Sequence, residues 1–192
     1  MKISMFYIIF FTLVISCSSK PYSNVMKLNG AMDYNWNITI DYPESSYGDF
    51  KYKKNKSGTI TITNYTGSDD VIASSDIDGS GVTSIGHRTF YCSQISSVII
   101  PDSVTSIKAY AFSGNRLTSI IIPDSVRTIE YHAFLDNLLT TITIGANVAI
   151  RDRDDGNKKG TGIPNYFDDF YIYNERKAGP YTYMNNQWVV VN

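Results

Sequence analysis

Apolar residues in the middle of the chain recur at a fixed interval of 22 positions (104−82, 126−104 and 148−126). The valines of this series are Val82, Val104, Val126 and Val148, and the phenylalanines are Phe90, Phe112 and Phe134. Self-similarity at a fixed period of about 20–50 residues is typical of solenoids, in which each repeat forms one coil and contacts only its neighbours. The pattern therefore predicts a short stack of three or four coils.

The first half of a repeat has the alternation of a short β-strand. Ile120 and Ile122 are expected on one face of this strand and Ile121 on the other. Pro123 ends the strand because proline lacks the N–H that a ladder needs. Equivalent strands in successive coils predict a parallel sheet along one face of the solenoid, with neighbouring strands ~4.8 Å apart.

The second half of a repeat returns the chain to the core. Residues 124–125 are Asp-Ser, which favours a turn, and Val126 and Ile129 are the next apolar positions. The spacing of Ile129 and Ala133 predicts a single helical turn, after which Phe134 fills the interior. Each coil has only a thin apolar wedge, so the coils are stable only when stacking buries a shared core.

Two repeats match a known pattern in full. The matching residues are Leu117, Ile120, Ile122, Pro123, Ser125, Val126, Ile129, Ala133 and Phe134 in one repeat, and Ile95, Val98, Ile100, Pro101, Ser103, Val104, Ile107, Ala111 and Phe112 in the repeat before it. This pattern resembles the BspA-like leucine-rich repeats, a bacterial class with the unit L-x-x-I-x-I-P-x-S-V-x-x-I-x-x-x-A-F. The resemblance implies a β-rich solenoid, a right-handed leucine-rich-repeat coil with a parallel sheet on one face.

The outer copies depart from the pattern. Thr89 stands where alanine is expected, and beyond Val148 neither the isoleucine nor the Ala-Phe pair recurs in register. With its flanks the resemblance covers residues 50 to 192, and residues 177–183 resemble a tail motif of spirochaetal members. Such repeats are familiar from surface lipoproteins of oral bacteria and spirochaetes. The resemblance therefore implies adhesion to host proteins, host cells or other bacteria, and with it a role in virulence.

The two flanks of the repeats are predicted to be caps. Residues 51–58 and the alternating residues 59–63 predict a hairpin that covers the open first coil. Residues 151–160 are polar and predict a surface loop. Residues 166–173 and 181–191 have a strand-like composition, so we expect a C-terminal cap made of strands.

The N-terminus has the features of a secretory signal. Lys2 is followed by an apolar run over residues 3–15, too short for a comfortable transmembrane helix of about 20 residues. Residues 14–17, Val-Ile-Ser-Cys, resemble the bacterial lipobox, which implies cleavage before Cys17 and lipidation of that cysteine. An ordinary cleavable signal or an uncleaved anchor is the alternative. Acyl chains contribute ~0.8 kcal/mol per buried CH₂, so several chains would hold the protein on a membrane.

These patterns divide the chain into five parts. We expect a lipoprotein signal peptide over residues 1–16, a tether over 17–48, an N-terminal cap and first coil over 49–81, leucine-rich repeats over 82–150 and a C-terminal cap over 151–192. Ser18 and Ser19 after the cysteine do not resemble the usual inner-membrane retention signal. The expected location is therefore the bacterial cell envelope, as an outer-membrane lipoprotein exposed on the surface.

Composition narrows the possible functions. The chain of 192 residues carries 17 Lys+Arg and 18 Asp+Glu, so its net charge of −1 gives no global field that would attract nucleic acid. With two cysteines it is not a disulfide-framed module. Four lysines form the one basic cluster, and on an edge hairpin we expect them to block strand pairing. They are Lys51, Lys53, Lys54 and Lys56.

The sequence offers little catalytic or metal-binding chemistry. His87 and His132 stand 45 positions apart (132−87), without a zinc-type spacing, and we expect both to face solvent. Cys92 and His87 lack a signature that would orient them as nucleophile and base, so a turn or buried cysteine is the preferred interpretation. Residues 151–162 fail as a calcium loop because arginines occupy its first and third positions. We expect no catalytic residue, metal site or cofactor.

The candidate site is a surface, formed by the outward strand positions of three repeats. These positions are Ser97, Ile99, Ser119, Ile121, Thr141 and Thr143. If the face is open, Ile99 and Ile121 form an apolar stripe among hydroxyls, as a partner-binding face would. The alternative is that the pair only packs along adjacent strands. Tyr91, Tyr110 and Tyr131 near the coil corners are weaker candidates.

Three hypotheses for the function follow. The first is a non-catalytic, lipid-anchored surface protein that binds host extracellular-matrix or cell-surface proteins, or other bacterial surface proteins. The second is a structural scaffold of the envelope that faces the periplasm. The third is a hydrolase acting on an envelope or host polymer, which is disfavoured because repeat scaffolds rarely catalyse without an added site.

Overall fold

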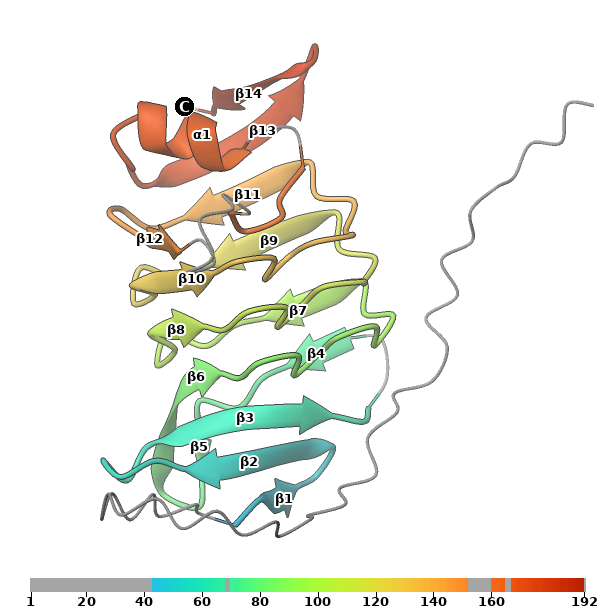
Figure 1. Ribbon diagram of the computed structural model, residues 1–192, viewed down its shortest axis with the longest axis vertical. Coiled ribbons are helices and arrows are strands. Elements are labelled where there is room, and N and C mark those ends of the chain that lie inside the picture. Colours follow the sequence, from blue (N-terminus) through green and yellow to red (C-terminus); the bar gives the residue numbers. More distant parts are fainter. Residues whose placement is uncertain (1–42, 68–69, 152–159, 165–166, 192) are drawn as a thin grey trace, which may run out of the picture. The chain divides into compact units, whose positions relative to one another are not determined.

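The computed structural model describes residues 43–67, 70–151, 160–164 and 167–191, which form a solenoid of stacked coils closed by a cap at each end (Figure 1). The predicted signal peptide, Cys17 and most of the predicted tether lie outside the described residues. No helix in the described ranges is long and apolar enough to cross a membrane.

Parallel strands run along two sides of the coils. On the first side lie β6 (Ser80–Ile85), β8 (Ser106–Ile107), β10 (Thr128–Glu130) and β12 (Ala149–Arg151). On the second side lie β4 (Asp70–Ile72), β7 (Ser97–Ile99), β9 (Ser119–Ile122) and β11 (Thr141–Ile144). We call the first set the first sheet and the second set the second sheet. The second sheet is the one that the sequence predicts, and the solenoid is confirmed. The first set was not predicted from the sequence, because β8, β10 and β12 have only two or three residues each, too few for an alternation that indicates a strand.

The predicted helical turn before each phenylalanine is wrong. Tyr110 and His132 have φ angles of 57° and 55°, which interrupt any run of right-handed helical residues. The N–H of Ala111 donates to the C=O of Lys108, three residues back, and the N–H of Ser113 donates to the C=O of Tyr110. Each coil corner is therefore a pair of tight turns.

The core consists of side chains that repeat from coil to coil. The rings of Phe90, Phe112 and Phe134 are fully buried and stack almost parallel, with centroid distances of 5.0 and 5.4 Å. Ile85, Ile107 and Ile129 form a second buried column, since they are register partners in the first sheet. Stacking thus buries a continuous core that no single coil contains.

An asparagine ladder, which the repeat analysis did not identify, joins the coils. Asn115 is buried, accepts a hydrogen bond from the N–H of Ile95 at 3.1 Å, and donates to the C=O groups of Phe90 and Phe112 at 2.7 and 2.8 Å. Asn137 repeats these contacts one coil later. In the first coil the equivalent position is Ser93, whose buried hydroxyl has no hydrogen-bond partner. The ladder satisfies backbone groups that the corner turns leave unpaired.

The N-terminal cap contains the predicted hairpin. Strands β2 (Phe50–Lys54) and β3 (Ile60–Tyr65) pair antiparallel, and β3 joins β6 in parallel at the first coil. Strand β1 (Ser45–Tyr47), within the range expected to be a tether, pairs with the other side of β2. Lys51 therefore lies between two strands, so the edge-blocking interpretation is wrong for this lysine, whereas Lys53 and Lys54 lie beyond the β1 ladder, which ends at Tyr52. A short strand β5 (Asp76–Ile77) pairs with β6.

The C-terminal cap agrees with the prediction in its last two strands but not in the segment before them. Strands β13 (Gly179–Met184) and β14 (Gln187–Val190) form an antiparallel hairpin, and β13 pairs with β11 of the last coil. The strand expected over residues 166–173 is instead helix α1 (Phe167–Tyr173). Phe167 and Tyr171 lie about one helical turn apart, so a helix places both side chains on the same face, and both are fully buried.

Candidate binding face

The six candidate positions form one face of the second sheet, which we call the binding face: Ser97, Ile99, Ser119, Ile121, Thr141 and Thr143. Ile99 is 58% exposed and Ile121 is 67% exposed, although both are large apolar residues. Their neighbours in the chain, Ile100 and Ile120, are buried in the core. The strands thus alternate between core and solvent, and the isoleucine pair lies on the solvent side.

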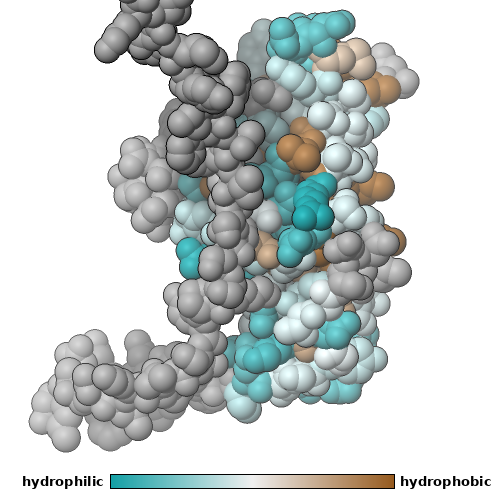
Figure 2. Space-filling model, turned by 90° about the vertical axis from the view of Figure 1, so that its right-hand side faces the viewer, coloured by the Kyte–Doolittle hydropathy of each residue, from teal (hydrophilic) through white to brown (hydrophobic). Residues whose placement is uncertain are grey.

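The hydroxyl groups of the binding face are not bonded to one another. Within the described ranges, the side chains of Ser97, Ser119, Thr141 and Thr143 make no hydrogen bond. On the side of the molecule that Figure 2 presents, hydrophobic residues reach the surface among hydrophilic and intermediate ones. The binding face combines the exposed side chains of Ile99 and Ile121 with hydroxyls that are available to a partner.

The sheet of the binding face is interrupted between β7 and β9. Strand β7 pairs with β4 and strand β9 pairs with β11, but no ladder in the described part of the chain joins β7 to β9. An open depression of about 440 Å³ lies at this break. Ile99 and Ile121 line it together with Ser97, Ser119 and Asp102. The two exposed isoleucines therefore flank a hollow in the surface.

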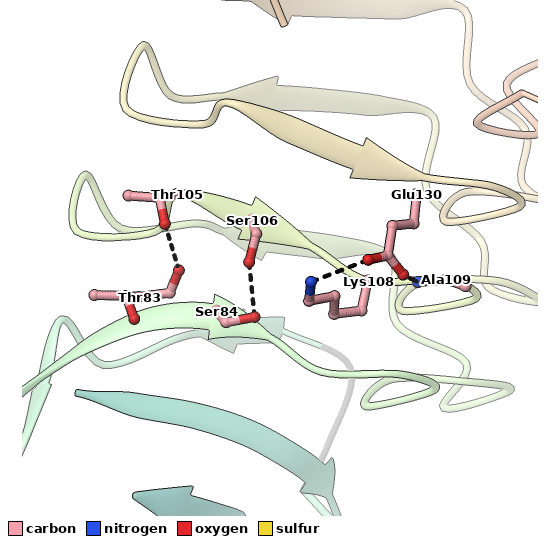
Figure 3. Close-up of polar contacts among 7 residues, drawn as sticks. All are labelled: Thr83, Ser84, Thr105, Ser106, Lys108, Ala109 and Glu130. Atoms are coloured by element: carbon pink, nitrogen blue, oxygen red, sulfur yellow. Dashed lines mark hydrogen bonds and ion pairs between the residues drawn. The ribbon is translucent and has the colours of Figure 1, made fainter. Parts of the chain in front are cut away.

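The outer side of the first sheet differs, because its polar side chains make hydrogen bonds to the neighbouring coil (Figure 3). The hydroxyl of Thr105 donates to the C=O of Thr83 at 3.1 Å, and that of Ser106 donates to the hydroxyl of Ser84 at 2.9 Å. These hydroxyl groups therefore already have hydrogen-bond partners within the protein. This side is therefore less suited to hold a partner.

An ion pair extends the polar rungs of the first sheet. Lys108 Nζ lies 3.0 Å from one carboxylate oxygen of Glu130, whose other oxygen accepts the N–H of Ala109 at 3.0 Å (Figure 3). Both charged side chains are partly exposed, so the pair contributes at most about 1 kcal/mol. Its role is to tie two coils together.

The corner turns assemble an aromatic cluster that the sequence did not predict as a unit. The guanidinium of Arg88 lies 5.3 Å from the ring centroids of both Tyr91 and Tyr110. The hydroxyl of Tyr110 lies 3.0 Å from Nδ1 of His132. Arg88, Tyr110 and His132 stand 22 residues apart and have φ angles of 55–57°. The 22-residue period was the signal that could have grouped them.

The two histidines lie in different surroundings. Partial burial lowers the pKa of His87, the neighbouring Arg88 cation lowers it further, and Glu130 acts weakly in the opposite direction. His87 is exposed as predicted, whereas His132 is half-buried. In the part of the chain that the structure describes, no three His, Cys, Asp or Glu side chains could hold a metal ion together. Cys92 lies in a corner turn, with a φ of 52°.

Comparison with known proteins identifies the repeats. The family model of the BspA type leucine rich repeat region matches residues 50–153 in six copies, over half of the chain. The chain belongs to the BspA-type leucine-rich-repeat family. Members of this family are built of leucine-rich repeats, which agrees with the solenoid and its parallel strands. Comparison with curated proteins gives no match.

Crystal structures of bacterial leucine-rich-repeat proteins resemble this chain. One, from T. pallidum, is 28% identical with a TM-score of 0.50, over 64% of this chain and 62% of that protein. Another, from Bacteroides capillosus, is 26% identical with a TM-score of 0.49, over 63% of this chain and 94% of that protein. The chain thus spans less than two thirds of the length of the T. pallidum protein.

Proposed function

We propose that this family member is a non-catalytic binding protein, anchored by lipid at Cys17 and exposed on the bacterial surface, whose binding face holds a protein partner. The partner would be a host extracellular-matrix or cell-surface protein, or a surface protein of another bacterium. The observation that carries the proposal is the exposure of Ile99 and Ile121 at 58% and 67%, beside hydroxyls without internal hydrogen bonds. Exposed apolar side chains beside hydroxyl groups have the composition of a partner-binding face.

The size of the face sets the strength expected from one copy. Complete burial of two isoleucine side chains contributes roughly 3–6 kcal/mol, and the association itself costs at least about 4 kcal/mol. Hydroxyl hydrogen bonds add about 1 kcal/mol each. A single face therefore binds weakly, and many copies anchored side by side would raise the avidity by about 10²–10⁴.

Binding is tested with the purified protein and a panel of immobilised extracellular-matrix proteins. We expect saturable binding to at least one member of the panel, and loss of that binding in the double variant Ile99→Asp, Ile121→Asp. Thr105→Asp on the first sheet is the matched control, since Thr105 is also exposed and lies on a strand connection of the same coil. Equal binding by both variants would contradict a role for the face.

The location is tested separately by protease treatment of intact cells. Loss of the protein, while a periplasmic protein stays intact, is the result expected for a surface-exposed anchor. Complete protection would contradict surface exposure and favour a scaffold that faces the periplasm. Lipidation is tested by growing cells on a labelled fatty acid: the wild type should take up the label and Cys17→Ser should not, and a wild type without label would contradict lipidation at this cysteine.

A further inference from the structure

The register of the C-terminal hairpin continues the binding face beyond the repeats. Thr141 and Thr143 of β11 are the partners of Thr182 and Pro180 of β13. Thr182 in turn pairs with Val189 of β14. Paired residues in a sheet point to the same face, so these positions lie on the same side as the binding face.

A second contact completes the outer row. The N–H of Val191 donates to the C=O of Pro180 at 3.0 Å, which places Val191 opposite Pro180. One row across the strands therefore contains two isoleucines, a threonine, a proline and a valine, and the neighbouring row contains hydroxyl residues and Val189. The rows are Ile99, Ile121, Thr143, Pro180 and Val191, and Ser97, Ser119, Thr141, Thr182 and Val189.

None of these ten residues carries a charge, and we call them the extended face. Among the residues that line the depression, Asp102 is the charged one. Val191 is 42% exposed and Pro180 is exposed, so the apolar row stays open at the hairpin end. The hairpin is thus more than a cover for the last coil.

We propose that the C-terminal hairpin forms part of the binding face, and that the extended face takes an uncharged, extended segment of a partner protein lying along the solenoid axis. This inference rests on the proposed binding function. It adds the chemistry of the partner segment and its direction, since the apolar row crosses the strands and runs from coil to coil.

The lack of charge selects the partner. A charged side chain placed against the extended face would lose water without gaining an opposite charge, which costs several kcal/mol unless the group turns away. Apolar and hydroxyl side chains carry no such cost and find isoleucine, valine and free hydroxyl groups to contact. The partner segment is therefore expected to be rich in apolar, serine and threonine residues.

The dimensions favour a segment over a second copy of the chain. The four paired strands β9, β11, β13 and β14 span ~14 Å at ~4.8 Å per step, and β7 lies one coil beyond them, so an extended segment of about six residues covers the row. Two rows of side chains offer only a few hundred Å², below the ~800 Å² per partner of a stable protein pair. A strand-like segment can use such a narrow surface, whereas a dimer of folded copies needs more.

The test uses a displayed library of random dodecapeptides and the purified protein. Peptides selected on the wild type are measured against Ile121→Asp, Val191→Asp and Val190→Asp. Val190 is the matched control, because it is also 42% exposed but lies on the opposite side of β14 from Val191. Pro180→Asp is a second variant of the same row if Val191→Asp fails to fold.

The proposal expects uncharged peptides whose affinity falls at least about tenfold in Ile121→Asp and Val191→Asp and stays within about twofold in Val190→Asp. Loss in Ile121→Asp alone would overturn the role of the hairpin and leave the proposed function standing. Enrichment of acidic or basic peptides would overturn the uncharged partner. No enriched peptide, or concentration-dependent self-association that Ile121→Asp abolishes, would overturn the partner segment altogether.

Discussion

Substitution of Asn115 by alanine is the most informative test of how the coils are held together. The side chain of Asn115 makes three short hydrogen bonds to the backbone, with the N–H of Ile95 and the C=O groups of Phe90 and Phe112, and a longer one of 3.4 Å to the C=O of Ser113. Alanine removes all four; the C=O of Ser113 keeps the N–H of Cys92 as its donor, and the phenylalanine stack stays in place. The variant therefore isolates the polar ladder from the apolar core.

The expected loss in the free energy of unfolding follows from the hydrogen-bond partners that each backbone group keeps in the variant. The N–H of Ile95 loses its partner, and the C=O of Phe90 keeps only a long contact of 3.4 Å from the N–H of Ser93. The C=O of Phe112 still accepts from Asn137 at 2.9 Å. Two buried groups are thus left unsatisfied at about 1–3 kcal/mol each, so we expect a loss of about 4 kcal/mol.

The shared acceptor predicts that the two asparagines are coupled. Asn115 and Asn137 both donate to the C=O of Phe112, and either one alone keeps it satisfied. In the double alanine variant this carbonyl has no donor. The double variant should therefore lose about 1 kcal/mol more than the sum of the two single variants.

The assay is urea unfolding followed by circular dichroism, with the slope of the transition checked for each variant. Asn55→Ala is the control, because the Asn55 side chain bonds to Thr59 and Thr61 at a partly exposed position and water can replace these bonds. We expect the control to lose less than about 1 kcal/mol. A loss below about 1 kcal/mol in Asn115→Ala, or strict additivity in the double variant, would refute the reasoning.

Three further predictions concern the face, the core and the cap. Ile99→Asp and Ile121→Asp together should change the melting temperature by no more than about 3 °C, because both side chains are exposed; a thermal scan checks this. Phe112→Ala should cost about 3–5 kcal/mol in urea unfolding, since its fully buried ring stacks on both sides. Tyr171→Phe should cost about 1–3 kcal/mol, because the buried hydroxyl donates to the C=O of Gly145 at 2.6 Å. Burial raises the pKa of Tyr171, so folding favours the neutral hydroxyl and stability falls as the pH rises above about 10; unfolding between about pH 9 and 11 should show a weaker fall in the variant.

The sequence predicts the solenoid because its period records the core directly. Valine, isoleucine and phenylalanine recur every 22 residues since each fills the same place in its coil. The outward positions of β7 and β9 follow from the same alternation, which places Ile120 in the core and Ile121 at the surface. The hairpins at both ends are likewise predictable from alternation interrupted by turn residues.

The asparagine ladder, the C-terminal helix and the extension of the binding face depend on three-dimensional contacts that the 22-residue period does not reveal. Asn115 and Asn137 keep the 22-residue step, but an asparagine in a turn is expected to face solvent until its buried partners are known. The helix over residues 167–173 has an aromatic composition that also suits a strand. The hairpin extends the binding face only through the register of β13 with β11, which no local pattern reveals.

The most direct test of the central claim is labelling of an engineered cysteine on intact cells with a membrane-impermeant maleimide. Ile121→Cys reports the binding face and Thr105→Cys the first sheet, Ile120→Cys is the buried control at 3% exposure, and the unsubstituted protein gives the background. The account predicts that the first two variants are labelled before lysis and that the third is not. Labelling of Ile121→Cys only after lysis would contradict a binding face that is open on the outside of the cell.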